Sequence, residues 1–375
     1  MRILLITGSL PPMKCGIGDY TAQLAETLGR RSGVTVGVLT DVAAQPVPTG
    51  RSYEVLPVAH GWKMSDLPRI VRTVRRWRPD IVHTQYPTQG YGLRKLPFVL
   101  PLTLALFRFP IVQTWHEYYR QSGIVQIKGS LLNLANALLP GGLIVVRPNY
   151  KETMSGWYRW LIRHKQFRFI PNASVVPVAV PSDADRSAIR ARFVSDSRAL
   201  IAYFGFVYPA KGIERLFDIA DPARHHLVLI CDLVESDPYH QIILNRIRAA
   251  DWADCVTVTG FQPAEEVSRL LAAADAAVFP FREGGGKWNT SLQGALAQGT
   301  FVVTTSREQH GYDATDNIYY ARPDDVADMR QALNAHSGQR AIRTKPRQWV
   351  DWDTIADDHL SLYESVRKRR PDEPY

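Results

Sequence analysis

The sequence has little cysteine, and what it has is scattered. Cys15, Cys231 and Cys255 are the only three among 375 residues, and they form neither a CxxC pair nor a Cys/His metal pattern. We interpret them as small buried apolar side chains. A sparse, odd set also fits a reducing cytoplasm, where thiols stay free. The sequence therefore predicts a cytoplasmic protein without a cysteine-based metal site.

Long apolar runs are also missing. The opening stretch from Met1 to Gly8 has one basic residue and a short apolar run, which predicts a first β-strand rather than a secretion signal. The longest apolar stretch, Leu96 to Phe107, contains Pro97 and Pro101 and is too short to span a bilayer. It is either a buried helix or one that touches a membrane, and we expect a buried one.

The chain has an excess of positive charge, with a formal net charge of +9. Such an excess points to an anionic partner, which could be a nucleotide, a polyphosphate, a nucleic acid or a membrane surface. One basic run has no nucleic-acid recognition module beside it, so we expect no nucleic-acid partner. This run is either a solvated helix face or a patch that contacts anionic lipid headgroups on the inner face of the membrane. It comprises Arg69, Arg72, Arg75, Arg76 and Arg78.

Short apolar runs alternate with helical patterns along the whole chain, which predicts parallel α/β sheets. The expected helices include Gly18–Gly29, Ala264–Ala273 and Thr290–Ala297. The expected strands are Ile3–Thr7, Val34–Leu39, Ile81–Thr84, Ile111–Thr114, Leu143–Val146, Phe169–Ile170, Leu200–Phe204, Leu227–Cys231, Val256–Thr259, Ala276–Phe281 and Phe301–Thr304. A length of 375 residues is large for one hydrophobic core and comfortable for two. The alternation is interrupted by a polar, proline-rich stretch at 176–185, which we interpret as a linker. We therefore expect Rossmann-like domains at 1–176 and 186–350 that face a central cleft, and a C-terminal helix at 351–370 that crosses back toward the first domain.

Two of the informative segments follow predicted strands of the first domain. Gly16 and Gly18 lie between the first strand and the first helix, where backbone N–H groups can approach an anion. Thr21 breaks the GxGxxG pattern, so a nicotinamide site is not indicated. His116 and Glu117 follow a later strand, and this pair could orient a sugar hydroxyl or move a proton. Taken alone, the glycine pair could equally be a structural turn, and a single histidine is more often structural.

Two further segments follow strands of the second domain. Lys211 comes just before a helix start, where its charge and the helix dipole can act on one phosphate. The richest segment begins at Glu283 and continues through three consecutive glycines, 284–286. Because such glycines cost entropy, we expect the backbone there to meet a ligand. The donors that follow it suit a diphosphate, and they are Lys287, Asn289, Thr290, Ser291 and the amide of Leu292.

Two DxD strings, Asp183–Asp185 and Asp351–Asp353, could in principle bind a divalent cation. One lies in the predicted linker and the other before the last helix. Neither follows a strand into the cleft, as a site for Mg²⁺ and a diphosphate would require. We therefore expect no metal site.

Together these segments resemble the family-four retaining glycosyltransferases of the GT-B fold. The similar motifs run from Gly16-Ile17-Gly18-Asp19-Tyr20-Thr21 through Arg78-Pro79-Asp80-Ile81-Val82-His83, His116-Glu117, Tyr203–Gly205 and Lys211-Gly212 to 272–280, 294–303 and the helix after Trp352. The resemblance covers nearly the whole chain. It implies transfer of a sugar from a nucleotide sugar to an acceptor hydroxyl, with retention and without a metal cofactor, in glycan, glycolipid or polysaccharide biosynthesis. The implied partners are a nucleotide-sugar donor and a carbohydrate or lipid-linked acceptor.

The resemblance also implies roles for individual residues. Gly16 and Gly18 would lie by the donor phosphates or sugar, and His116 would contact the transferred sugar. Lys211 would pair with the diphosphate, and Glu283 would face the sugar. The amides of Ser291 and Leu292 would bind the diphosphate, with Gly284, Lys287, Asn289 and Thr290 beside them, and the loop around Phe261 would lie near the base.

Two positions depart from the family pattern. Phe206 stands where the family usually has arginine, and Gly294 stands where it has the second glutamate, which usually holds the ribose. Lys287 or Arg147 could supply the missing positive charge. These departures leave two alternatives open: a non-catalytic subunit of the same fold that binds nucleotide sugars, or a sugar-nucleotide epimerase, for which only Glu283 and Glu117 are candidate acid/base groups.

Overall fold

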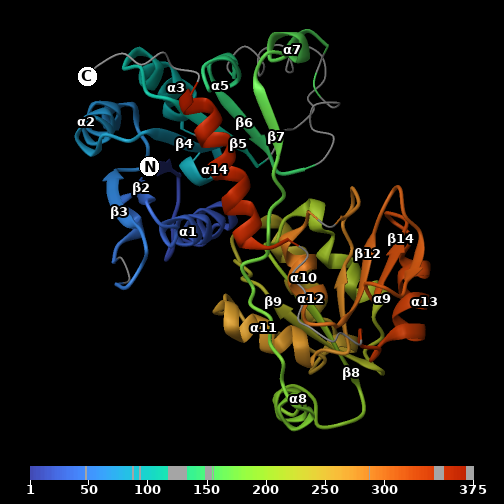
Figure 1. The fold of residues 1–375 in the computed structure, drawn as a ribbon. Helices are drawn as coiled ribbons and strands as arrows, with labels where there is room; N and C mark the ends of the chain where they lie inside the picture. Colours follow the sequence, from blue (N-terminus) through green and yellow to red (C-terminus); the bar gives the residue numbers. More distant parts are fainter. Residues whose placement is uncertain are drawn as a thin grey trace. The chain divides into compact units, whose positions relative to one another are not determined.

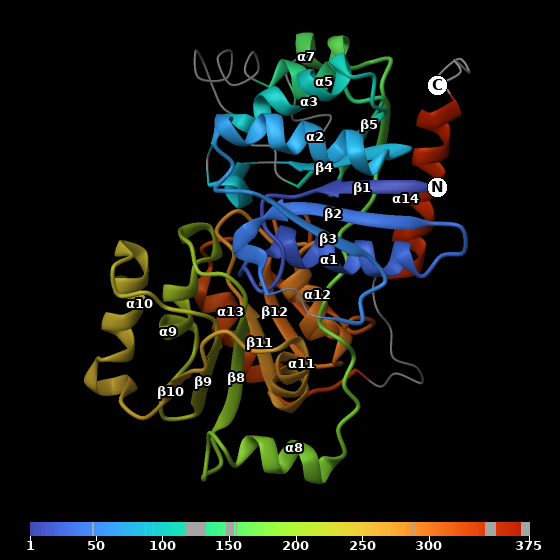
Figure 2. The same ribbon diagram turned by 90° about the vertical axis from the view of Figure 1, so that its left-hand side faces the viewer.

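The structure is a computed structural model that describes residues 1–46, 49–86, 88–92, 94–116, 133–147, 154, 156–286, 288–341 and 350–368. The chain divides into two compact units (Figures 1 and 2). Unit 1 consists of Met1–Asn172 with Val350–Tyr375, and unit 2 of Ala173–Trp349. Lys287 and Glu117, which the sequence singled out, lie outside the described residues.

Unit 1 is built on a seven-stranded sheet in the order β3-β2-β1-β4-β5-β6-β7. Every strand pair in it is parallel. The central strands are buried along their whole length, as expected where helices cover both faces of a parallel sheet. The strands are β1 (Arg2–Ile6), β2 (Thr35–Asp41), β3 (Glu54–Ala59), β4 (Ile81–Tyr86), β5 (Ile111–Trp115), β6 (Gly142–Val145) and β7 (Gln166–Phe169).

Helices cover the two faces of this sheet in two sets. On one face α14 packs on β5 and β6 and against α1, and a Cβ at Gly142 would lie 3.1 Å from Leu362 of α14. On the other face α2 and α3 pack on Val82 and Ile111, and α5 and α7 pack on Leu143 and its neighbours. The helices are α1 (Gly16–Gly29), α2 (Leu67–Trp77), α3 (Leu96–Leu106), α5 (Leu134–Leu138), α7 (Gly156–Leu161) and α14 (Trp352–Lys368).

Unit 2 repeats this plan with a sheet in the order β10-β9-β8-β11-β12-β14-β13. Its strands are parallel except for β13, which runs antiparallel to β14. The strands are β8 (Ala199–Phe204), β9 (His225–Ile230), β10 (Val256–Val258), β11 (Ala276–Phe279), β12 (Phe301–Thr305), β13 (Gly311–Asp313) and β14 (Ile318–Ala321). The helices are α8 (Asp183–Arg190), α9 (Leu216–Ile219), α10 (Pro238–Ile247), α11 (Ala264–Ala273), α12 (Thr290–Ala297) and α13 (Val326–His336).

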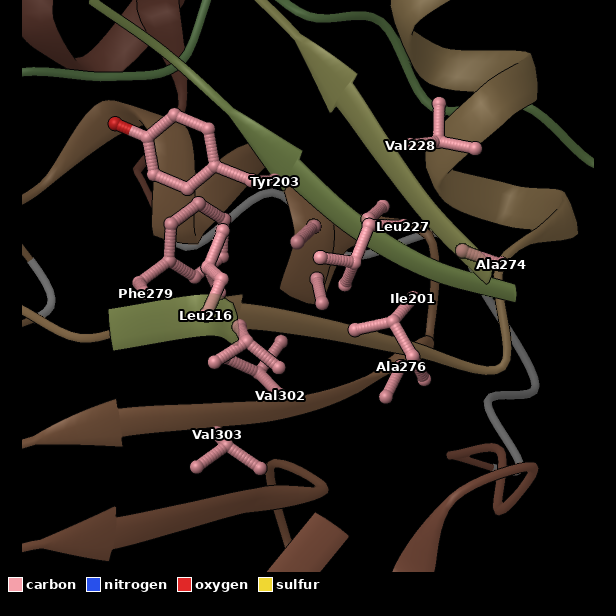
Figure 3. Packing of buried hydrophobic residues seen from close by; sticks show 14 of the residues in the cluster. Ile201, Tyr203, Leu216, Leu227, Val228, Ala274, Ala276, Phe279, Val302 and Val303 are labelled. Carbon is pink, nitrogen blue, oxygen red and sulfur yellow. The ribbon is translucent and has the colours of Figure 1, made fainter. Parts of the chain in front are cut away.

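The core of unit 2 forms between its sheet and its helices (Figure 3). Side chains of β8, β9, β11 and β12 interdigitate there with Leu216 of α9. Tyr203 and Phe279 lie at the carboxyl end of this core, with ring centroids 6.0 Å apart. The core therefore holds the carboxyl ends of β8 and β11 rigidly side by side.

The structure differs from the sequence prediction at several elements, including β3, α8 and α3. The prediction missed β3, which contains Pro57, because a proline inside an apolar run argues against a strand. Part of the predicted linker is helix α8, which begins with a capping box between Ser182 and Asp185. The helix predicted at Leu96–Phe107 is present as α3, but it is not fully buried, since Leu106 is 74% exposed.

Two facts bear on membranes and metals. In the part of the chain that the structure describes, none of the helices has the length and apolar character needed to cross a bilayer. Among the same residues, no three His, Cys, Asp or Glu side chains come together as potential metal ligands.

Candidate functional site

Each parallel sheet reverses its strand order at one point, and the segments with Gly16 and Gly18, Lys211 and Glu283 follow the strands there. In unit 1 the reversal lies between β1 and β4, and in unit 2 between β8 and β11. Ligands of open parallel sheets bind beyond the carboxyl ends of the strands at this position. We therefore describe the candidate site as two sets of loops, one in each unit.

Two glycines let the loops of unit 2 touch each other. Gly212 follows β8 with φ +65°, and a Cβ there would lie 2.3 Å from the carbonyl oxygen of Pro280, which follows β11. Gly205 has φ +140°, and its Cβ would lie 2.8 Å from Ser291 Oγ. No other residue fits either position without moving the backbone. The glycines thus bring the loop after β8 against both the loop after β11 and the start of α12.

Lys211 lies in the first of these contacts. Its Nζ is 4.7 Å from the ring centroid of Phe281 and 5.2 Å from that of Tyr208. The Arg282 amide donates to the carbonyl oxygen of Ala210 at 3.0 Å, which ties the two loops together. Lys211 therefore places a positive charge beside the loop that begins at Phe281.

The three consecutive glycines of this loop are packed closely rather than loosely. Gly284 has φ +89°, and the Gly285 amide donates to the Thr305 carbonyl oxygen at 2.7 Å. A Cβ on Gly285 would lie 2.4 Å from the Phe281 ring, and one on Gly286 would lie 2.1 Å from the ring of Trp288. The glycines are therefore required by the fold of the loop. Glu283 is exposed at its start.

Helix α12 begins directly after this loop. The first hydrogen bond of the helix runs from the Gln293 amide to the Asn289 carbonyl oxygen at 3.0 Å. The amides of Thr290, Ser291 and Leu292 therefore come before the first hydrogen bond within the helix. The side chain of Asn289, the N-cap residue, makes no capping hydrogen bond. Such a helix start attracts anions. Since the Leu292 side chain is fully buried, only its backbone could take part in binding.

Phe261 lies beyond the carboxyl ends of the neighbouring strands β9 and β10. Its ring is 52% exposed, and its amide donates to Asp232 Oδ1 at 2.8 Å. Gly260, with φ +71°, makes the turn that allows this bond. The loop therefore presents an aromatic face at the same edge of the sheet.

The two departures from the family pattern have different structural settings. Phe206 is 48% exposed, and its carbonyl oxygen accepts from the buried Tyr203 hydroxyl at 3.0 Å. Gly294 is buried, and a Cβ there would lie 3.2 Å from Ser174 Oγ and 3.3 Å from Val176 Cγ2. A glutamate at position 294 would therefore meet protein rather than a ligand.

The segment that covers Gly294 is held along α12 by two glutamines. Gln293 Oε1 accepts from the Ser174 amide at 2.8 Å. Gln298 Oε1 accepts from the Ala179 amide at 2.8 Å, and its Nε2 donates to the Pro177 carbonyl oxygen at 2.9 Å. We refer to residues 174–179 as the covering segment.

In unit 1, the loops after β1 and β4 also touch through glycine. A Cβ at Gly8 would lie 2.3 Å from the carbonyl carbon of Gly90. Gly18 is buried in the first turn of α1, where a Cβ would lie 3.0 Å from the Ser9 carbonyl oxygen. Gly16 is exposed at the start of the same helix. Of the two glycines, only Gly18 therefore has a packing reason to be glycine.

His116 follows β5 and is buried. Its amide donates to the Tyr86 carbonyl oxygen at 2.8 Å, and its Nε2 pairs with Gln85 Oε1 at 2.7 Å. The Tyr20 ring meets it edge-on, with centroids 4.9 Å apart. Burial, with a smaller contribution from His359, lowers the pKa of His116 to about 3. The ring is therefore neutral near pH 7, where it can donate or accept a hydrogen bond but cannot act as an imidazolium acid.

Helix α14 contributes two further polar side chains, His359 and Tyr363, to the buried region around His116. Tyr20 Oη lies 3.4 Å from His359 Nε2, and burial lowers the pKa of His359 to about 4. Tyr363 Oη lies 2.6 Å from Nδ1 of His83, whose pKa is held well below its usual range by burial. These contacts form a continuous buried polar cluster, which runs from α14 to the carboxyl ends of β4 and β5.

Asp19 stands in the first turn of α1, next to Gly18. Burial raises the pKa of its carboxyl to about 6. The protonation of Asp19 therefore changes closer to neutral pH than that of an ordinary aspartate.

Sequence reasoning missed several residues that build the site. In unit 2, Glu214 accepts hydrogen bonds from both Arg282 and the Tyr239 hydroxyl, and the same hydroxyl accepts from the Ile213 amide at 3.0 Å. In unit 1, Gln85 and Tyr20 contact His116. Gln85 lies near the end of β4, just after the Arg78–His83 motif, and Tyr20 belongs to the Gly16–Thr21 motif in α1, and these places were the available signal. Arg147, considered as a substitute cation, is exposed directly after β6.

Comparison with known proteins gives a consistent result. Residues 15–205 match the model of the glycosyl transferase 4-like domain, and residues 198–336 match that of the glycosyl transferases group 1. The chain is 22% identical to a GDP-mannose-dependent alpha-mannosyltransferase of Mycobacterium tuberculosis, over 99% of this chain and 98% of that protein.

Solved structures of the same fold cover nearly all of the chain. Sucrose-phosphate synthase from Thermosynechococcus elongatus has a TM-score of 0.76 at 19% identity, covering 98% of this chain and 100% of its own. HepE of Anabaena, solved in complex with UDP, has a TM-score of 0.74 at 16% identity, covering 97% and 100%. These likenesses show the GT-B fold with its two Rossmann-like sheets. The family models cover both units, and the chain therefore belongs to the glycosyl transferase 4-like family of GT-B glycosyltransferases.

Proposed function

We propose that this glycosyltransferase takes a nucleotide sugar as donor, binds its diphosphate in unit 2 and transfers the sugar to a carbohydrate or lipid-linked hydroxyl. The observation that carries the proposal is the contact between the loops after β8 and β11. It places the Lys211 ammonium, the glycine loop 284–286 and the start of α12 at one edge of one sheet. A cation and a helix N-terminus together suit a diphosphate.

The chemistry breaks the bond from the anomeric carbon to the diphosphate oxygen and forms a bond to the acceptor oxygen. Negative charge grows on the departing diphosphate, and Lys211 and the amides of residues 290–292 would stabilise it where it develops. The acceptor hydroxyl must lose its proton, and we propose that the departing phosphate oxygen receives it. Attack then comes from the same side as departure, which gives retention of the anomeric configuration.

We propose that His116 acts as a hydrogen-bonding group toward the transferred sugar. The support is its position after β5 and its lowered pKa, which keeps the ring neutral. Glu283, exposed at the start of the glycine loop, would accept bonds from the sugar hydroxyls. Gly16 and Gly18 would admit the donor to the start of α1.

We also propose that no metal is needed, because Lys211 and the α12 start supply positive charge where the diphosphate would sit. The test is transfer or donor hydrolysis in the presence of a chelator. Activity that disappears on chelation and returns with Mg²⁺ would contradict metal independence, without touching the rest of the proposal.

The central experiment is a thermal-shift screen of UDP-, GDP-, ADP- and dTDP-sugars, followed by turnover assays with the donors that bind. A ligand that binds only the folded state must raise the melting temperature. Lys211→Ala and His116→Ala should abolish turnover, whereas Lys368→Ala, which removes an exposed lysine from the end of α14, should not. If no sugar nucleotide shifts melting, the donor site proposed here is wrong.

Two outcomes would favour the alternatives. Tight nucleotide binding without hydrolysis or transfer to any acceptor would favour a non-catalytic binding subunit. Isomerisation of the sugar without transfer would favour an epimerase. Retention is tested separately, from the anomeric configuration of the product by NMR.

We further propose peripheral contact with an anionic membrane on its cytoplasmic side. The support is α2, which carries Arg69, Arg72, Arg75 and Arg76 on exposed positions and no acidic residue. Such a segment is attracted to anionic lipids. Binding to vesicles that contain phosphatidylglycerol, and its loss at high salt, tests the contact.

A further inference from the structure

The two helical layers of unit 1 carry opposite charge. Within their bounds, the helices α2, α3, α5 and α7 contain five arginines and no acidic residue, and the arginines are Arg69, Arg72, Arg75, Arg76 and Arg159. The helices on the other face are net negative, with six acidic residues and two basic ones. The acidic residues are Asp19 and Glu26 in α1 and Asp353, Asp357, Asp358 and Glu364 in α14, and the basic ones are Arg367 and Lys368 at the end of α14. An anionic surface would therefore attract one face of the sheet and repel the other.

The positively charged layer also exposes large apolar side chains. Trp157 and Trp160 of α7 are 44% and 62% exposed. Because they are three residues apart, they share one face of the helix, while Tyr158 is buried on the other side. At the end of α3, Leu102, Leu106 and the following Phe107 are exposed as well. Exposed tryptophans need a reason, since burial of such a ring is strongly favourable.

Arginines lie directly against these apolar side chains. Arg163 Cζ is 3.9 Å from the ring centroid of Trp160, and Arg75 Cζ of α2 is 5.3 Å from that of Phe107. Aromatic rings next to guanidinium groups are typical of surfaces at the level of lipid headgroups, where the ring enters the boundary and the cation meets phosphate. The sequence around α7 offers no negative charge to balance these arginines, since the chain has no acidic residue between Glu152 and Asp183.

We infer that the α2–α3–α5–α7 layer is a membrane-docking face, and that Trp157 and Trp160 are the side chains that enter the bilayer boundary. The inference rests on the peripheral membrane contact proposed above and names the surface that makes it. The arginines of α2 would provide electrostatic attraction, and α7 and the end of α3 would provide apolar anchoring. Two such signals together give stable attachment where each alone gives a weak one.

The partner chemistry is an anionic phospholipid surface rather than a soluble glycan. A sugar stacks on a ring face, and Arg163 already covers one face of Trp160. A bilayer also matches the spread of the exposed side chains over two helices of one layer. In Figures 1 and 2, α3, α5 and α7 of unit 1 can be followed along this side of its sheet.

The test is flotation of the full-length protein with vesicles of phosphatidylcholine alone or mixed with phosphatidylglycerol. We expect binding to the mixed vesicles only. Trp157→Ser with Trp160→Ser should weaken it on the order of ten-fold, from the apolar area no longer buried. Removing Arg72 and Arg76 should weaken it roughly five-fold per charge, which corresponds to about 1 kcal/mol for each arginine.

Brominated phosphatidylcholine separates insertion from simple attraction, because it quenches only tryptophans at the acyl boundary. Quenching should occur in the wild type and in the Arg72→Ser/Arg76→Ser variant at saturation, and disappear in the double tryptophan variant. Matched controls are Ile242→Ser on α10 and Arg224→Ser before β9, both exposed in unit 2, and neither should change binding. Unchanged melting of each variant shows that folding is intact.

Three results would overturn the inference: equal binding by the double tryptophan variant, equal binding to neutral and anionic vesicles, or a tryptophan-dependent self-association in ultracentrifugation, which would make the face a protein interface. Donor hydrolysis and transfer in solution are measured in parallel. If vesicle binding behaves as expected but no donor is hydrolysed or used for transfer, the proposed enzymatic function fails while the docking face stands.

Discussion

Gly294 offers a sharp test of how the donor site is built, because the family usually has glutamate at this position. If Gly294 faced the nucleotide, Gly294→Glu would restore a ribose contact and tighten donor binding. The structure predicts the opposite. The position is buried under the covering segment, and a Cβ would already lie 3.2 Å from Ser174 Oγ.

The expected cost follows from two terms. Adding side-chain volume to a packed region costs about 1–3 kcal/mol. Burying a carboxyl group without a partner costs about 1–3 kcal/mol more, and the group would stay protonated to avoid a larger penalty. Gly294→Glu should therefore lower the free energy of unfolding by roughly 4 kcal/mol. For a unit of this size, that lowers the melting temperature by about 10 °C.

Calorimetry and thermal-shift assays, each with and without the best donor, measure both effects. Gly294→Ala is the matched control: it gains about 0.5–1 kcal/mol from helix propensity and loses part of this to the tight contact, so its stability should stay near wild type. Val176→Ala should relieve some of the crowding. The double variant Gly294→Glu/Val176→Ala should therefore be more stable than the sum of the single effects predicts.

The reasoning would be refuted by a Gly294→Glu protein that melts with the wild type and binds a nucleotide sugar more tightly. That result would mean that the covering segment moves aside and that position 294 faces the ligand. If Gly294→Glu is destabilised but its effect simply adds to that of Val176→Ala, position 294 is buried, but by contacts other than those with the covering segment.

Three further predictions concern single groups. Burial lowers the pKa values of His83, His116 and His359 below the ordinary 6.5, so these side chains take up protons when the protein unfolds in mild acid. The free energy of unfolding should therefore be at its full value above about pH 6.5 and fall toward pH 4, by up to about 2 kcal/mol per histidine at pH 5. Urea unfolding at several pH values checks this; His359→Gln should flatten the slope, and Asp19 partly opposes it, because its raised pKa makes stability fall as pH rises from about 4 to 6. Lys211→Ala should weaken donor binding by about 1.5–3 kcal/mol in calorimetry, with Lys211→Arg between the two, and equal affinity would remove Lys211 from the site. Phe206→Arg should tighten diphosphate binding roughly five-fold, an effect that high salt reduces, and no change would mean that Phe206 lies away from the phosphates.

The two parallel sheets could be predicted from the sequence because their central strands are buried on both faces. A strand such as β1 is then apolar at each buried position, and Ile3–Ile6 appears in the sequence as a continuous apolar run. Helices α11 and α12 were predicted with the bounds that the structure gives them. Edge elements are less constrained, and the edge strands β3 and β13 were missed, together with β14 between β12 and β13.

The surroundings of the candidate site could be predicted only in part. Glycines that touch a distant loop, such as Gly205 against Ser291, appear in the sequence as ordinary turn glycines. The covering segment packs on α12 from about 120 residues away, and no local pattern announces it. The histidine cluster likewise joins α14 to strands some 280 residues earlier, through the bond between His83 and Tyr363.

The two departures from the family pattern are consequently of different kinds. Phe206 is an exposed substitution in an otherwise intact loop, so it removes a charge and leaves space for a ligand. Gly294 is part of a repacked interior in which Gln293 and Gln298 hold the covering segment where a glutamate side chain would extend. The first can be reversed by one substitution and the second cannot. We therefore propose that donor recognition in unit 2 concentrates on the phosphates, through Lys211 and the start of α12, and that any contact with the ribose comes from residues other than position 294.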